Sequence, residues 1–364
     1  MTATETSEVM AASQSAPSER GVRRDIATLV TGAGGEVGHG LIAALHAAGR
    51  KDIIAIDIRA LDDRQRGLCR ETYVGDICET ALLGRLQSMY EITEVYHLAA
   101  LLSTRTEFVP EAAHAVNVGG MFNLLRLAAD QARSHGKRVR FMFPSSIAVY
   151  GLGDLKAKNR AGAIGEDQYL QPTTMYGCNK VYCENLGRYY ARHYRQLAQD
   201  RMDHILDFRC IRFPGLISAE TVPCGGTSDF AAQMVHAAAE GKPYACFVRP
   251  DTRMAFMTMP DAIEAFMRLA GADAGHLSRC VYNVTSFNPS AAEFADMVRE
   301  HFPAARISFE PDPQRQAIVD SWPVDVDDTA ARTDWGYSPK HDLRSAFEQY
   351  LVPNVTARYA KGRA

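Results

Sequence analysis

The chain has 364 residues, of which 46% are hydrophobic and 23% are charged, and its formal net charge is −3. These values are ordinary for a globular protein with a sizeable core, built as one large domain or as a domain with a smaller lobe. They give no electrostatic reason to expect nucleic acid or an anionic membrane as a partner, and no apolar run approaches the roughly 18 residues of a membrane-spanning helix.

Residues 1–25 are rich in Ala, Ser, Thr and Glu and show no periodic apolar pattern, which predicts a disordered leader. A cleaved organelle-targeting peptide is the alternative, favoured by three arginines in this stretch and opposed by three glutamates. The eight cysteines include no Cys-x-x-Cys pair, which argues against a zinc site and is typical of a reducing cytosol. We therefore expect a cytoplasmic protein without a metal.

The first predicted strand, residues 26–30, leads directly into a glycine-rich turn and then into a predicted helix over 37–48. Strand, glycine turn and helix in this order predict a dinucleotide cradle. Glycines let the backbone approach a pyrophosphate, and the helix N-terminus attracts its charge. The cofactor contacts expected in this turn are Gly32, Gly35, Val37 and Gly38.

The second predicted strand, residues 53–57, ends in Asp57, which lies 19 residues after Gly38. A carboxylate at this place can accept hydrogen bonds from a ribose diol and would repel a 2′-phosphate. Asp57 therefore favours NAD over NADP. Arg59 nearby is the opposing signal, because an arginine could serve a phosphate.

Strands and helices alternate through the first half of the chain, which predicts an α/β fold with a doubly wound parallel sheet of the Rossmann type. The further strands are expected at 71–75, 94–99, 139–143 and 206–212, and the further helices at 78–90, 110–134 and 175–197.

After residue 214 the alternation loosens, and we expect a smaller lobe that closes on a substrate. Its predicted helices are 228–240, 261–270, 291–301 and 342–351, and its short strands are 244–248, 280–285 and 306–309. The expected organisation is thus a leader (1–25), an NAD-binding domain (26–214), a mainly substrate-binding lobe (215–355) and a tail (356–364).

Tyr176 and Lys180 lie four residues apart at the start of the predicted helix 175–197. This spacing stacks both side chains on one helix face, about 6 Å apart along the axis. A nearby ammonium favours the phenolate, so Tyr176 could take a proton from an alcohol near neutral pH. Ser146 follows closely on the predicted strand 139–143, and its hydroxyl could hold the reacting oxygen beside the phenol. A serine there could also simply cap a turn.

The glycine pattern Gly32-x-x-Gly35-x-x-Gly38, Ser146 and Tyr176-x-x-x-Lys180 together resemble the extended short-chain dehydrogenase/reductase family. The resemblance implies that Tyr176 is the catalytic acid/base, that Lys180 holds the nicotinamide ribose and favours the tyrosinate, and that Ser146 orients the substrate oxygen. It also implies further cofactor contacts, namely Asp76, Ile77, Leu98, Ala99, Ala100, Pro214, Leu216 and Ile217, and Asn117 as the residue that steadies the lysine.

Longer segments resemble the L-threonine 3-dehydrogenase branch of that family, from about residue 26 to 350. They are 97–103, 144–151, 172–177, 213–218, 225–229 and 315–323. The resemblance implies NAD⁺-dependent oxidation of L-threonine at its 3-hydroxyl to 2-amino-3-ketobutyrate, and a homodimer formed through helices 110–134 and 175–197. Residues 152–165 look longer than is typical, which could alter access to the site.

A small zwitterionic substrate needs polar anchors in a mostly closed pocket. Besides Ser146 and Tyr176, we expect Ser103, Thr227 and Trp322 to contact it. Trp322 could instead be lobe packing, and Thr227 could be a helix cap.

Two other functions stay open. A nucleotide-sugar 4-epimerase or dehydratase would share the cofactor site and the Ser-Tyr-Lys set, but it is expected to carry an Arg-Asp-aromatic pattern, and here Arg253 is followed by Met254. A non-catalytic NAD(H)-sensing protein on the same fold could dispense with Tyr176 and Lys180, which this chain keeps.

Overall fold

The computed structural model describes residues 24–223 and 225–360, and its centre is a parallel sheet of seven strands in the order β3-β2-β1-β4-β5-β7-β11. The alternating apolar residues of each strand point to opposite faces, so Phe141 and Phe143 of β5 pack on one face and Met142 packs on the other. The seven strands are β1 (Asp25–Thr31), β2 (Ile53–Asp57), β3 (Glu71–Val74), β4 (Tyr90–His97), β5 (Val139–Ser146), β7 (Leu206–Phe213) and β11 (Val281–Asn283).

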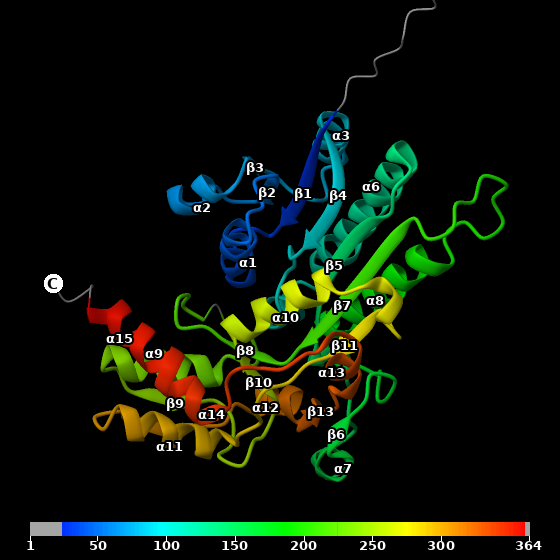
Figure 1. Ribbon diagram of the computed structural model, residues 1–364. Coiled ribbons are helices and arrows are strands. Elements are labelled where there is room, and N and C mark those ends of the chain that lie inside the picture. The colour runs from blue at the N-terminus through cyan, green and yellow to red at the C-terminus, as the bar shows by residue number, and fades with distance from the viewer. Residues whose placement is uncertain (1–23, 224, 361–364) are drawn as a thin grey trace, which may run out of the picture.

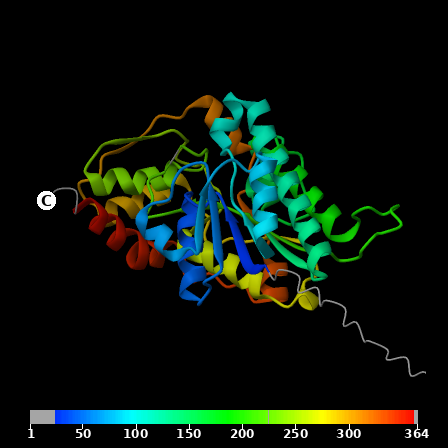
Figure 2. The ribbon, with the colours of Figure 1, turned by 90° about the horizontal axis from the view of Figure 1, so that it is seen from above.

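Helices cover both faces of the sheet, and α6 and α10 lie on opposite sides of it (Figures 1 and 2). The first face carries α3 (Thr80–Met89), α4 (Ser103–Phe108), α5 (Pro110–His114), the π-helix η1 (Ala115–Gly119), α6 (Gly120–His135) and α8 (Met175–Arg192). The second face carries α1 (Glu36–Ala47), α2 (Asp63–Leu68), α10 (Met259–Gly271) and α13 (Thr329–Trp335). This is the doubly wound Rossmann-type fold that the alternation of elements predicts.

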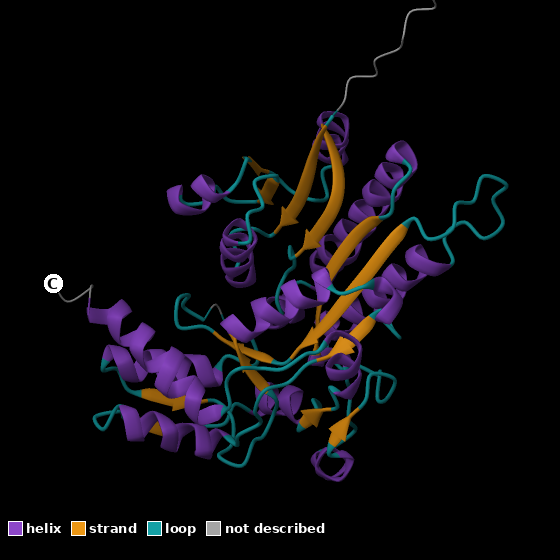
Figure 3. Cartoon of the chain, viewed as in Figure 1, coloured by secondary structure: helices purple, strands orange, loops and turns teal. Residues whose placement is uncertain are grey.

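A smaller lobe lies beside the carboxyl ends of the strands and is mainly helical, with strands of only two or three residues (Figure 3). Its own apolar core gathers four phenylalanines, Phe230, Phe256, Phe294 and Phe347. The helices are α9 (Phe230–Glu240), α11 (Ala291–His301), α12 (Pro313–Asp320), α14 (Leu343–Ser345), the π-helix η4 (Ala346–Leu351) and α15 (Val352–Ala360). The strand pairs are β8 (Gly215–Ile217) with β10 (Phe256–Thr258), and β9 (Tyr244–Cys246) with β12 (Ile307–Phe309).

The remaining elements are short. α7 (Leu155–Ala161) and β6 (Ala163–Ile164) follow the 3₁₀ turn η2 (Ile147–Val149), and β6 pairs with β13 (Asp325–Val326). A second 3₁₀ turn, η3 (Ala274–His276), follows α10.

Three elements from beyond residue 214, namely β11, α10 and α13, belong to the large sheet layer rather than to the lobe. β11 pairs in parallel with β7 and forms an edge of the seven-stranded sheet. α10 packs against α1 and contributes Phe266 and Leu269 to the apolar core on that face. The chain therefore crosses from the sheet to the lobe and back again.

Several predicted element boundaries are wrong. Helix 175–197 ends at Arg192, because the chain turns away there and Arg195 adopts a φ of 54°, which a helix does not allow. The connection from α8 to β7 protrudes from the molecule (Figure 1). The expected helix 110–134 contains the π segment η1, and α15 extends to Ala360, so residues 356–360 of the expected tail are helical.

Most of the expected leader, residues 1–23, lies outside the described residues, and β1 begins at Asp25. Within the part of the chain that the structure describes, none of the helices combines the length and apolarity needed to cross a bilayer.

Candidate active site

The glycine-rich turn between β1 and α1 forms one wall of a cavity of about 710 Å³. Gly32 has a φ of +68°, and a Cβ there would lie 2.5 Å from the backbone nitrogen of Ala99. A Cβ on Gly38 would lie 2.6 Å from the carbonyl oxygen of Gly32. Only glycine fits either position, and the absence of side chains leaves the N-terminus of α1 open to a ligand.

The cavity is large enough for a dinucleotide-sized ligand and runs along the carboxyl ends of β1, β2, β4, β5 and β7. Most of the predicted cofactor contacts line it, namely Gly32, Gly35, Val37, Gly38, Asp57, Asp76, Ile77, Leu98, Ala99, Ala100, Tyr176, Lys180, Pro214 and Leu216. Asn117 and Ile217 do not line it.

Asp57 ends β2 at this cavity, and both of its carboxylate oxygens accept backbone hydrogen bonds. Oδ2 accepts from the nitrogen of Gly34 at 2.9 Å, and Oδ1 accepts from the nitrogen of Arg59 at 3.1 Å. The carboxylate is thereby held beside the glycine turn. The free lone pairs of this carboxylate can accept the two hydroxyls of a ribose, as the residues of an NAD site must.

Ser146, Tyr176 and Lys180 all line the same cavity as the glycine turn. Tyr176 and Lys180 lie in the first turns of α8, which begins after Thr174 accepts a capping hydrogen bond from the nitrogen of Gly177 at 3.1 Å. Ser146 ends β5, where its hydroxyl accepts from the nitrogen of Ala148 at 3.2 Å. Ser146 thus both caps the η2 turn and lines the cavity.

Lys180 is buried, and its position is set by the strand that carries Ser146. Its Nζ donates to the carbonyl oxygen of Pro144 at 2.6 Å and lies 5.4 Å from the ring centroid of Tyr176. The same charge, together with burial as the larger cause, lowers the pKa of His97 to about 3. His97 is therefore neutral near pH 7.

Asn117 lies in the π-helix η1 and holds a backbone segment of the cavity wall. Its side chain accepts from the nitrogen of Leu101 at 2.8 Å and donates to the carbonyl oxygen of the same residue at 3.1 Å. Among the described contacts none joins its side chain to Lys180, whose Nζ donates to Pro144 instead.

The predicted substrate contacts lie at the end of the cavity that the lobe covers. Ser103, at the start of α4, and Trp322 line the cavity, whereas Thr227 is buried behind it, between Gly226 and Ser228. The hydroxyl of Ser103 accepts from both the nitrogen and the hydroxyl of Thr227, each at 3.2 Å. Thr227 therefore fixes Ser103 across two parts of the chain, and it does not cap α9.

Two carboxyl groups in the cavity were missed by sequence reasoning. Glu36 follows Gly35 in the glycine turn, and Asp229 precedes α9 of the lobe. Burial, followed by the charge of Asp229, raises the pKa of Glu36 to about 7, and the hydroxyl of Thr221 opposes the shift. The sequence did contain a signal for Glu36, because an acidic residue inside a predicted pyrophosphate cradle is unusual.

The unusual segment 152–165 holds the chain that carries Trp322. Its short helix α7 presents Lys158, which is 1% exposed and donates from Nζ to the carbonyl oxygen of Val319 at 2.9 Å. The nitrogen of Leu152 also donates to the carbonyl oxygen of Ser321 at 2.8 Å. This segment thus braces one side of the expected substrate pocket.

A buried ionic network supports the strand end that carries Ser146. Arg212 donates to Glu184 through Nε at 2.9 Å and Nη2 at 2.6 Å, and Glu184 accepts the hydroxyl of Ser145 at 2.5 Å. The other guanidinium nitrogen reaches the carbonyl oxygen of Glu166 at 2.6 Å.

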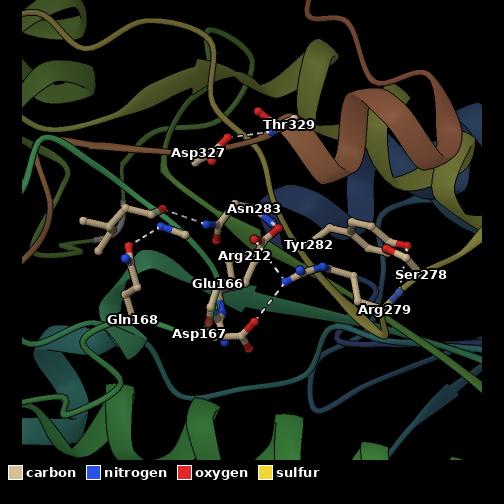
Figure 4. Close-up of polar contacts among 12 residues, drawn as sticks. Glu166, Asp167, Gln168, Arg212, Ser278, Arg279, Tyr282, Asn283, Asp327 and Thr329 are labelled. Atoms are coloured by element: carbon tan, nitrogen blue, oxygen red, sulfur yellow. Dashed lines mark hydrogen bonds and ion pairs between the residues drawn. The ribbon is translucent and has the colours of Figure 1, made fainter.

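The network continues outward from Arg212 to the molecular surface (Figure 4). Glu166 accepts from the nitrogen of Asn283 at 3.2 Å and forms an ion pair with Arg279 at 3.1 Å. Arg279 in turn lies 3.5 Å from Asp167. β5, α8, β7 and β11 are therefore fixed relative to one another behind Ser146, Tyr176 and Lys180.

Known proteins resemble the chain over nearly its whole described length. A model of the NAD dependent epimerase/dehydratase family matches residues 28–285. The mitochondrial L-threonine 3-dehydrogenase of Bos taurus is 36% identical over 317 residues, which cover 86% of this chain and 78% of that protein.

Solved structures give the same result. The holo form of a GalE-like L-threonine dehydrogenase from Cupriavidus necator is 34% identical with a TM-score of 0.77. A monomeric L-threonine 3-dehydrogenase from a metagenome database, in its apo form, is also 34% identical with a TM-score of 0.79. Both alignments cover 92% of this chain and 99% of the other. The chain therefore belongs to the NAD dependent epimerase/dehydratase family of extended short-chain dehydrogenases/reductases, and its cofactor is NAD.

Proposed function

We propose that this protein is an NAD-dependent L-threonine 3-dehydrogenase, which oxidises the 3-hydroxyl of L-threonine to give 2-amino-3-ketobutyrate, a step of threonine breakdown. The observation that carries the proposal is one cavity that is lined both by the glycine turn of the dinucleotide cradle and by Ser146, Tyr176 and Lys180. The relatives named L-threonine 3-dehydrogenase, at 36% and 34% identity, support the choice of substrate.

NAD fits the first wall because the cradle has no side chains at its closest approach and Asp57 offers carboxylate oxygens at the end of β2. Bound NAD⁺ supplies the acceptor for the hydride that leaves C3 of the substrate. The proposed cofactor contacts are those of the predicted set that line the cavity, and Asn117 holds the lining residue Leu101 in place.

The protein residues move the proton. Tyr176 as phenolate takes the proton of the 3-hydroxyl, and its phenol oxygen becomes protonated as the C3–O bond becomes a carbonyl. Ser146 donates a hydrogen bond to the same oxygen and keeps it within reach of the phenol. Lys180, held by Pro144, places a positive charge beside the ring and stabilises the phenolate.

The substrate end of the cavity can bind the amino-acid part. Ser103 reaches this space from α4, and Trp322 reaches it from the chain that follows α12, which segment 152–165 holds in place. Thr227 fixes the hydroxyl of Ser103. Hydroxyl and indole N–H donors suit a carboxylate.

The direct test is to incubate the purified protein with L-threonine and NAD⁺ and to measure NADH formation by its absorbance. A parallel reaction with UDP-galactose tests epimerisation. NADH formation without epimerisation is the expected result, and absence of NADH formation with L-threonine would disprove the proposal.

A nucleotide-sugar epimerase is the second candidate, because the family model that matches this chain is named for epimerases. Such a substrate needs cationic groups for its diphosphate. Arg253, the nearest candidate by sequence, does not line the cavity and instead contacts Asn288 at 2.7 Å and Glu293 at 2.7 Å. This observation favours the amino-acid substrate.

We also propose that two copies pair through α6 and α8, as the sequence leads us to expect. Three large side chains on these helices, Phe122, Tyr182 and Tyr189, are 40% to 52% exposed. A solved relative is described as monomeric, so light scattering on the purified protein decides between the two states. A mass of one chain would disprove the dimer.

The cytoplasm remains our proposed location. The seven cysteines in the described part of the chain are free thiols, as a reducing compartment allows. The relative from Bos taurus is named as mitochondrial, so fractionation of the source cells is the deciding measurement.

A further inference from the structure

Glu36 and Asp229 bring two carboxyl groups into the cofactor cavity from opposite parts of the molecule. Glu36 lies in the first turn of α1, beside the glycine turn. Asp229 ends the 225–229 turn of the lobe, where its Oδ2 accepts from the nitrogens of Gly225 at 2.9 Å and Gly226 at 2.6 Å. One carboxyl group of the pair therefore belongs to the cradle, and the other belongs to the turn that contains Thr227, the partner of Ser103.

The surroundings of Glu36 disfavour its negative charge. Burial is the largest cause, the charge of Asp229 is the next, and together they raise the pKa of Glu36 to about 7. The opposing group is the hydroxyl of Thr221. The other titratable neighbours are Tyr350 of η4, whose own pKa is raised by burial and by the Glu36 charge among other causes, and His39, which lines the same cavity one turn along α1.

Asp229 itself is held in place by its own turn. Arg315 donates to the carbonyl oxygen of Gly226 at 3.1 Å, and its charge also faces Asp229. Asp229 is thus fixed in place and engaged by two backbone donors.

We propose that Glu36 must carry a proton for NAD to bind tightly, so that cofactor binding takes up one proton and depends on pH near neutrality. The proposal rests on the placement of NAD in this cavity. A diphosphate at the N-terminus of α1 adds negative charge beside Glu36 and Asp229, and an ionised Glu36 would repel it in a partly desolvated site. A protonated carboxyl removes this repulsion and can donate a hydrogen bond.

The direction of the pH dependence follows from these charges. The bound anion stabilises the protonated form of Glu36 further, so the complex holds a proton that the free protein loses above about pH 7. Affinity should be constant below this pH and fall by up to about tenfold for each unit above it.

The test is the dissociation constant of NAD⁺, measured by titration calorimetry between pH 6 and 8.5 for the wild type and for Glu36→Gln. Glutamine keeps the shape of the side chain and cannot ionise. We expect the wild-type constant to rise with pH and the E36Q constant to stay nearly flat. Calorimetry in two buffers with different ionisation enthalpies should show uptake of about one proton by the wild type near pH 8 and none by E36Q.

Two further variants sharpen the result. Asp229→Asn removes the negative charge beside Glu36 and so makes ionisation of Glu36 easier. The NAD⁺ affinity of this variant should therefore begin to fall at a lower pH than that of the wild type. Glu300→Gln removes an exposed carboxylate from α11 and should leave the wild-type pH profile unchanged. Circular dichroism confirms that each variant is folded.

A flat wild-type profile, or an unchanged slope in E36Q, would overturn the proposal while leaving NAD as the ligand of this cavity. Failure of NAD⁺ to bind any folded variant at any pH would overturn both this proposal and the cofactor placement. The two failures are thus distinguishable.

Discussion

The two ends of the cavity are built in different ways. At the cofactor end, the groups that face the ligand are backbone atoms and strand-end side chains, positioned by segments of a few residues such as Gly32–Gly38 and Asp57. At the substrate end, the contact between Ser103 and Thr227 joins residues 124 apart in the chain, and the contact between Lys158 and Val319 joins residues 161 apart.

The difference indicates how each end should respond to change. A local motif tolerates alterations elsewhere as long as its own residues stay, whereas the substrate end depends on the lobe being docked on the sheet. We therefore expect variants at the cofactor end to change NAD binding alone, and variants of the long-range contacts to change the use of L-threonine. Each of the following variants probes that separation.

The largest effect on turnover is expected for Tyr176→Phe, which removes the proton acceptor. Loss of a general acid/base lowers kcat by about 10² to 10⁴ fold. NAD⁺ affinity should change little, because phenylalanine keeps the ring and removes only the hydroxyl, and the glycine turn and Asp57 are unchanged. Steady-state NADH formation together with calorimetry measures both quantities, and a Y176F protein that kept wild-type turnover would support the NAD(H)-sensing alternative.

Arg212→Met should give the largest loss of stability, because it leaves Glu184 as an unpaired buried carboxylate. Breaking a buried pair in this way costs about 3–5 kcal/mol of unfolding free energy. NAD binding and the use of L-threonine should both decrease, because the network fixes β5, α8 and β7 together. Urea unfolding is the measurement, and Arg344→Met, at an exposed pair with Glu300, is the matched control that should barely change the midpoint.

Lys158→Met should change how stability depends on pH. Burial lowers the pKa of Lys158 to about 8 from its ordinary value of 10.5. Between these two values the unfolded chain binds more protons than the folded chain. The contribution of this lysine to the free energy of unfolding therefore rises as pH increases from about 8 to 10.5. Below pH 8 its buried charge lowers the stability of the fold. The change can reach about 3 kcal/mol. Urea midpoints across this range should therefore rise in the wild type relative to K158M, and parallel profiles would contradict the expectation.

Asp57→Asn should affect the cofactor end only. Asparagine keeps one acceptor oxygen but loses the charge that binds a ribose diol and repels a 2′-phosphate. We expect KM for NAD⁺ to rise by about tenfold and discrimination against NADP⁺ to weaken, with KM for L-threonine unchanged. A parallel rise in both KM values would contradict the separation of the two ends.

Thr227→Val should give the smallest effect, at the substrate end. The variant keeps the shape of the side chain and removes the hydroxyl that donates to Ser103, while the backbone donor remains. A hydrogen bond of this kind contributes about 0.5–1.5 kcal/mol, so KM for L-threonine should rise by roughly two- to tenfold with NAD⁺ affinity unchanged. Ser228→Ala, one residue further on, serves as the control for disturbance of the turn.

The sequence predicted what depends on local pattern. The glycine turn, Asp57 and the spacing of Tyr176 and Lys180 are each recognisable within a few residues, and the structure places them around one cavity. The position of Thr227 behind Ser103 could not be predicted, because it depends on where the lobe docks. The same limitation applies to α7, whose buried Lys158 finds its acceptor only after the chain has folded back over it.

The edge of the large sheet also has a consequence for how the chain is made. A ribosome delivers residues 26–214 first, but β7 then lacks its neighbour β11 and α1 lacks its cover α10. An unpaired strand edge and an uncovered apolar helix face invite association with other chains. The cofactor motif is therefore complete early in synthesis. The edge of the sheet that holds it stays unpaired, and so prone to aggregation, until residue 283 has left the ribosome and β11 can pair with β7.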